Sequence, residues 1–215
     1  HQLQCLGDLG FHAIAPDMRG YGRSTVYPRH EDYALIHTVG DMIGLADALG
    51  IERAVWIGHD WGAPVVWSIA SHHPTRCHAV ANLCVPYATL ERGYEACLPL
   101  LDRSVYPVDE YPFGQWDYQV FYEEDFARAI QPMDANPTNA IKVVSRKGMP
   151  EMRGKVWRTA TIRRDGGWFG GAAEAPELPL DAVVLSEADL SVFVAALTRN
   201  GFFGPCSWYM NHERN

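Results

Sequence analysis

The sequence has no apolar run that approaches the ~18 residues needed to cross a bilayer as a helix. The most apolar late stretch, residues 182–197, is interrupted by Glu187 and Asp189. Basic clusters are also absent, since Lys and Arg total 18 against 26 Asp and Glu, for a net charge of −8. We therefore expect no membrane span and no nucleic-acid partner.

Cysteine is scarce, and its spacing excludes two further kinds of protein. The five cysteines form an odd set without a Cys-x-x-Cys pair, so neither a disulfide framework nor a metal site is expected. A reducing compartment suits such a chain, and we expect a cytoplasmic protein. What is present is ordinary for a globular domain: 215 residues, 47% hydrophobic and 20% charged.

One stretch combines a short apolar strand at residues 55–57 with an apolar helix from about Pro64. The turn between them reads Gly58-His59-Asp60-Trp61-Gly62. This spacing is typical of a nucleophile elbow, where a strained central residue projects its side chain above a sheet. We expect the positions of Gly58 and Gly62 to pass so close that only small residues fit. The alternative is a plain strand-to-helix turn in which Asp60 caps the helix.

This turn, continued by Ala63-Pro64, resembles the elbow of epoxide hydrolases of the α/β-hydrolase fold. Haloalkane dehalogenases share the Asp-Trp pair, and both groups form an alkyl-enzyme ester with an aspartate. The resemblance implies that Asp60 is the nucleophile, placed at a helix N-terminus that favours negative charge. A serine esterase is disfavoured, because the elbow carries aspartate.

A loop at residues 17–24, of pattern AxDxRGxGxS with its flanking residues, resembles the same family. We predict that Asp17, Arg19 and Arg23 are structural and hold this loop by charge-assisted hydrogen bonds.

Strand-like and helix-like segments alternate in the first part of the chain, and this order predicts a doubly wound parallel sheet. The expected elements are helices at 1–10, 38–49 (capped by Thr38 with Asp41) and 64–73, and strands at 11–16, 55–57 and 78–85. We interpret residues 1–86 as part of an α/β-hydrolase core with its nucleophile elbow. Residues 87–200 show no further strands and are interpreted as a mainly helical cap, with helices starting near Glu123 and at Ser186. Residues 201–215 then return from cap to core.

Two segments, Asp117–Glu124 and Gly201–Asn211, resemble the cap segments that carry two acid tyrosines in epoxide hydrolases. The resemblance implies that Tyr118 and Tyr209 hold the epoxide oxygen, since a phenol of pKa about 10 stays protonated at neutral pH. Tyr122 lies on the same helical face as Tyr118 and is the alternative to it.

Trp61 has two expected roles. Its backbone N–H would form half of an oxyanion hole, and its ring would form one wall of an apolar pocket. The alternative is a simple core tryptophan.

No histidine of the nine stands where the family has its water-activating base, and the upstream His-Gly-x-Pro loop is not found. We therefore expect a fragment, whose catalytic histidine and acid partner lie outside this chain. The resemblance implies a hydrolase that opens a small apolar epoxide with water to a vicinal diol, without metal or cofactor. Two alternatives stay open: a haloalkane dehalogenase-like hydrolase and a non-catalytic binding module. The oligomeric state is not predicted.

Overall fold

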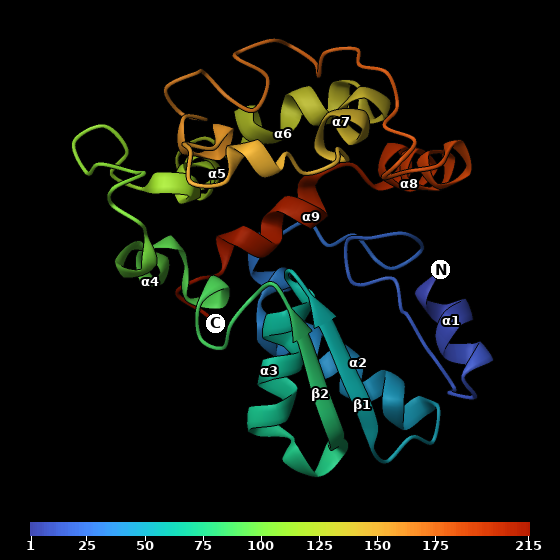
Figure 1. The fold of residues 1–215 in the computed structure, drawn as a ribbon. Coiled ribbons are helices and arrows are strands. Elements are labelled where there is room, and N and C mark those ends of the chain that lie inside the picture. The colour runs from blue at the N-terminus through green and yellow to red at the C-terminus, as the bar shows by residue number, and fades with distance from the viewer.

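A computed structural model describes residues 1–215 (Figure 1). Its sheet has two parallel strands, β1 (Ala54–His59) and β2 (Cys77–Leu83). Helix α3 (Gly62–His72) connects the strands and packs on both of them. This strand–helix–strand unit confirms the α/β class predicted from the sequence.

Most of the remaining helices lie in two groups, with α1 and α4 on opposite sides of the molecule (Figure 1). Helix α2 lies near the sheet and packs on α3, helices α5 to α8 lie beyond the upper ends of the strands, and α9 lies between these two groups. Their bounds are α1 (Gln2–Asp8), α2 (Leu35–Ala48), α4 (Tyr94–Cys97), α5 (Asp117–Glu124), α6 (Phe126–Ala135), α7 (Pro137–Val144), α8 (Glu187–Asn200) and α9 (Phe203–Ser207).

The prediction of a strand at residues 11–16 is wrong. This segment is irregular and pairs with neither β1 nor β2, so the sheet has two strands rather than three. Phe11 and Ile14, expected to be buried, are 61% and 42% exposed. Apolar composition alone does not make a strand, because the backbone groups of a strand need a hydrogen-bonded neighbour.

Helix α2 begins at Leu35, one turn before the cap predicted at Thr38. Thr38 is fully buried, and its Oγ1 donates to the carbonyl of Leu35 at 3.1 Å. The Leu35 N–H donates instead to Asn215 Oδ1 at 2.8 Å. The prediction was wrong because a residue 180 positions away in the chain satisfies this helix end.

Two other helix predictions have different outcomes. Helix α8 is confirmed, with a capping box between Ser186 and Asp189 and with Gly201 after its end at φ +68°. Helix α5 begins at Asp117 rather than near Glu123, so it carries the whole tyrosine segment.

The structural role predicted for the loop at residues 17–24 is confirmed for Arg19 and Asp17, whereas Arg23 contributes its backbone N–H and not its guanidinium. The Arg19 guanidinium donates to both carboxylate oxygens of Asp41, at 2.7 and 2.8 Å, and Asp17 Oδ2 accepts the Arg23 N–H at 3.0 Å. The loop also contacts α9: a Cβ added at Gly20 would lie 2.9 Å from Gly204 Cα. This backbone contact fixes the loop against the segment that leads to Tyr209.

The sheet has one covered and one open face. Trp56 packs into the core below α3, whereas Val55, Ile57 and Leu83, on the opposite face, are 51%, 55% and 52% exposed. No helix is both long and apolar enough to cross a membrane. The domain boundaries at residues 86 and 200 stay predictions.

Candidate functional site

Asp60 lies between the end of β1 and the start of α3, in a left-handed backbone conformation with φ +50°. Such a conformation costs a residue other than glycine about 1–3 kcal/mol, and aspartate is one of the residues that tolerate it. The turn is tight, since a Cβ added at Gly58 would lie 2.4 Å from the Gly62 carbonyl oxygen. The strand, strained aspartate and helix therefore form the predicted elbow geometry.

The expectation that Gly62 must also be small is wrong. A Cβ added at Gly62 meets no atom within 4 Å. The close approach is one-sided, because Gly62 presents its backbone carbonyl, rather than its own Cβ position, to Gly58.

The carboxylate of Asp60 is held at one oxygen. Its Oδ1 accepts the Trp61 backbone N–H at 2.8 Å, and its Oδ2 makes no hydrogen bond within the protein. The backbone carbonyl of Asp60 accepts the Ala63 N–H at 2.9 Å, which completes the first turn before α3. One oxygen is thus oriented, and the other is free to react.

The ring of Trp61 is 8% exposed and lies under the segment that follows α9. Its ring centroid lies 5.2 Å from that of Tyr209, edge-on, and 6.0 Å from that of Trp208. The indole Nε1 of Trp61 is buried without an acceptor. Trp61 is therefore both a core residue and the side chain that places Tyr209 beside the elbow.

Tyr118 and Tyr209 come together although 91 positions separate them in the chain. Their ring centroids are 5.6 Å apart with an interplanar angle of 78°. Burial raises the pKa of Tyr118 to about 12, while the Gln119 amide and the Tyr209 hydroxyl act in the opposite direction. Burial first, then the nearby Tyr118 and Asp60, raise the pKa of Tyr209 well above its usual value. Both phenols are therefore protonated at neutral pH.

Tyr122 packs in the same aromatic group, with ring centroids 6.1 Å from Tyr118 and 5.1 Å from Tyr209. This confirms the shared helical face predicted for Tyr118 and Tyr122. The hydroxyl of Tyr122 accepts from Cys206 Sγ at 3.6 Å, and the side chain is 4% exposed. The Tyr118 hydroxyl likewise accepts from the buried Gln119 amide, so these two contacts do not decide between Tyr118 and Tyr122.

The comparisons with known proteins agree with this geometry. A family profile described as alpha/beta hydrolase fold matches residues 1–171, about four fifths of the chain. The chain belongs to the α/β-hydrolase family. Its relatives place it among the epoxide hydrolases of that family.

Several relatives align with the whole chain. It is 32% identical over 218 residues to bifunctional epoxide hydrolase 2 of Sus scrofa and 32% identical over 216 residues to epoxide hydrolase A of Mycobacterium tuberculosis. The chain spans 36% of the length of the first relative and 63% of the second.

Solved structures of epoxide hydrolases have the same fold. The chain is similar to epoxide hydrolase A from Mycobacterium thermoresistibile, with a TM-score of 0.73 and 30% identity, over 100% of this chain and 63% of that one. A Vigna radiata epoxide hydrolase gives a TM-score of 0.69 and 28% identity, over 99% of this chain and 61% of that one. The predicted α/β-hydrolase fold is therefore confirmed.

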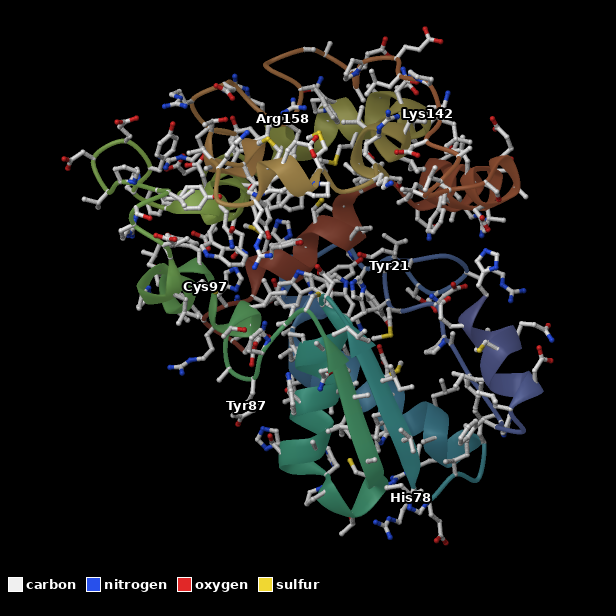
Figure 2. The ribbon with its side chains drawn as sticks, viewed as in Figure 1. Tyr21, His78, Tyr87, Cys97, Lys142 and Arg158 are labelled. Carbon is white, nitrogen blue, oxygen red and sulfur yellow. The ribbon has the colours of Figure 1, made fainter.

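None of the nine histidines of this chain hydrogen-bonds to Asp60 or forms an ion pair with it. His78 lies at the opposite end of the sheet from Asp60, as Figure 2 shows for the start of β2. His212 stacks on Trp61 with ring centroids 6.2 Å apart, and both its ring nitrogens are buried without a hydrogen bond.

The sequence analysis missed Gln119, which lies next to Tyr118 on α5. Its Nε2 donates to the Tyr118 hydroxyl oxygen at 3.2 Å, and the residue is fully buried. The only signal for it in the sequence is a large amide inside an apolar helix face, which is rarely buried without a partner.

Proposed function

We propose that this protein opens small apolar epoxides, with Asp60 as nucleophile and with Tyr118 and Tyr209 as donors to the epoxide oxygen. The observation that carries the proposal is the meeting of two protonated phenols from α5 and from the segment after α9, next to the Trp61 ring at the elbow. The epoxide-hydrolase relatives support it.

The first step forms a bond between Asp60 Oδ2 and an epoxide carbon, while the bond from that carbon to the ring oxygen breaks. The oxygen takes a proton from the phenol pair, so no free alkoxide accumulates. Oδ1, held by the Trp61 N–H, becomes the carbonyl oxygen of the alkyl ester. That N–H then donates to the oxyanion when water attacks the ester carbon.

The second step needs a base that removes a proton from water. In this proposal a histidine outside the described chain is that base. Hydrolysis of the ester gives a vicinal diol and the free Asp60 carboxylate, and the proton that it releases returns to the phenolate left by the first step. Neither step needs a metal or an organic cofactor, because the phenols supply the proton and the aspartate supplies the electron pair.

Alkylation of Asp60 tests the first step directly. The protein is incubated with styrene oxide, and its intact mass and peptide masses are measured. We expect a mass increase of one epoxide molecule, located on the peptide that contains Asp60. The Asp60→Asn variant should carry no adduct. The same adduct on that variant would refute the role of Asp60 as nucleophile. A wild-type protein that binds styrene oxide but forms no adduct would favour the alternative of a non-catalytic binding module.

A haloalkane dehalogenase-like activity is the second candidate. It is favoured by the buried indole Nε1 groups of Trp61 and Trp208, which have no acceptor and suit a halide. The paired phenols favour the epoxide. Chloride or bromide release from a haloalkane, with no adduct from styrene oxide, would reverse this preference.

A further inference from the structure

We propose that Gln119 is a positioning residue that turns the Tyr118 proton toward the epoxide oxygen. This inference rests on the proposed function and assigns unequal roles to the two phenols. Gln119 contacts no ligand itself and acts through Tyr118.

The geometry at Gln119 is unusual for a core amide. The side chain is 0% exposed, yet only its Nε2 has a partner, the Tyr118 hydroxyl oxygen at 3.2 Å. Its Oε1 is buried without any donor. Burying a half-satisfied amide is costly, and an apolar side chain of similar shape would avoid that cost. The Tyr118 contact is thus the one polar interaction this residue makes, which points to a role at the phenol.

The chemistry of the two groups fixes the direction of the hydrogen bond between Gln119 and Tyr118. An amide NH₂ only donates, so the Tyr118 oxygen is the acceptor in this hydrogen bond. The phenol's own proton is then free for another acceptor. As that proton moves to the epoxide oxygen, negative charge grows on the Tyr118 oxygen, and the bond from Gln119 strengthens. The same bond lowers the pKa of Tyr118 against the effect of burial.

The hydroxyls of the other two tyrosines have no amide donor. That of Tyr122 accepts from the Cys206 thiol, which is a weaker donor, and the Gln119 amide donates to Tyr118 rather than to Tyr209. Tyr118 therefore acts as the principal acid, and Tyr209 as a second donor that holds the oxygen.

Single-turnover alkylation of Asp60 by styrene oxide, followed by quenching and intact-mass measurement, tests the role. Gln119→Met keeps the length and removes the donor. We expect its alkylation rate constant at saturating epoxide to fall about 10- to 100-fold, the range for a hydrogen bond to a developing charge. The half-saturating epoxide concentration should change by less than about twofold. Gln131→Met makes the same substitution at an exposed glutamine of α6; it is the matched control and should alkylate like wild type.

Gln119→Glu separates this role from a merely structural one. An ionised carboxylate cannot donate and would accept the Tyr118 proton, so alkylation should be slow at neutral pH. Its rate should recover as pH falls through the glutamate pKa, because the acid form can donate. The titratable groups that face Tyr118 are Asp60, Cys97, Tyr122 and Tyr209. Wild type contains the same four groups, so its alkylation rate measured over the same pH range shows how much they contribute.

Two outcomes would overturn the inference. A faster Gln119→Met variant would mean that Gln119 withdraws the Tyr118 proton, and an unchanged rate would mean that it has no role. A readout without epoxide keeps the test separate from the proposed function: the Cζ resonance of Tyr118 in ¹³C-tyrosine NMR, assigned with Tyr118→Phe. It should move in Gln119→Met even if wild type forms no ester, and an unmoved resonance would refute the hydrogen bond.

Discussion

The regions on the two sides of Asp60 differ in how their apolar side chains are covered. Above the elbow, Tyr118, Tyr122 and Tyr209 pack ring against ring, and Tyr209 joins this aromatic group to Trp61 at the elbow. Below it, Val55 and Ile57 on one face of β1 are about half exposed. The difference teaches that the groups proposed to activate an epoxide are organised by contacts within this chain, whereas the sheet face gains little from burial.

Tyr209 explains how the covered region holds together. It packs against the apolar cluster that contains Trp61 and also against the cluster that contains Phe121, Tyr122 and Ile162. Tyr209, in the segment after α9, therefore links these two clusters, and Figure 1 shows α9 itself between helices α5 to α8 and the sheet. Substitutions in the covered region should change chemistry or stability strongly, and substitutions on the open face should not.

The largest effect is expected for the double variant Tyr118→Phe/Tyr209→Phe. With no phenol proton available, ring opening leaves an uncompensated alkoxide, and acid catalysis of this kind contributes about 10²–10⁴-fold. We expect single-turnover alkylation of Asp60 to fall by at least about 10³-fold while the fold, measured by circular dichroism, is kept. Either single variant should lose less, since the remaining phenol still donates. Alkylation of the double variant at the wild-type rate would show that the aromatic group is only packing.

The second prediction compares the two faces of the sheet. Ile69 on α3 is fully buried against the covered face, and Ile57 on the open face is 55% exposed. Ile69→Ala should lower the free energy of unfolding by about 2–5 kcal/mol, and Ile57→Ala by less than about 1 kcal/mol. Urea denaturation of both variants measures the difference. Equal losses would mean that the open face is covered in solution.

The third prediction concerns the elbow itself. Gly58→Ala forces a Cβ to within 2.4 Å of the Gly62 carbonyl oxygen, so the turn must shift. We expect a loss of about 1–3 kcal/mol and slower alkylation of Asp60. Gly62→Ala is the matched control, because its Cβ would enter open space; it should change stability by less than about 1 kcal/mol. Equal effects of the two variants would contradict the one-sided contact.

Local patterns in the sequence predicted what local physics determines. The elbow strand and helix follow from hydrophobic periodicity around Asp60, and α8 follows from its capping box at Ser186. The failures involve partners distant in the chain. Residues 11–16 have no neighbouring strand, and the cap of α2 comes from Asn215. The tyrosine pair was predicted by resemblance to a family, whereas the Gln119 contact depends on a side-chain conformation that no sequence pattern specifies.

The smallest predicted effect is a pH dependence of the free energy of unfolding. It arises from two buried histidines, one beside α9 and one at the elbow. His30 stacks on Phe203 of α9, and His212 stacks on Trp61 at the elbow. Burial lowers the pKa of both, so below the ordinary pKa of about 6.5 the unfolded chain binds more protons than the folded one. Stability is therefore greatest above pH 6.5 and declines as pH falls below it, until the folded histidines also protonate.

Urea denaturation at about pH 7.5 and about pH 5.5 measures this decline. His212→Phe keeps a stacking ring and should reduce the decline more than His30→Phe, because the His212 side chain is only 8% exposed and its burial is the more complete. Burial raises the pKa of Asp117 and Glu123, so these two groups add stability as pH falls through their own, more acidic range and oppose the histidines there. If both phenylalanine variants kept the full wild-type decline, neither histidine would be its source, and the stacked rings at the elbow and beside α9 would be equally insensitive to protons.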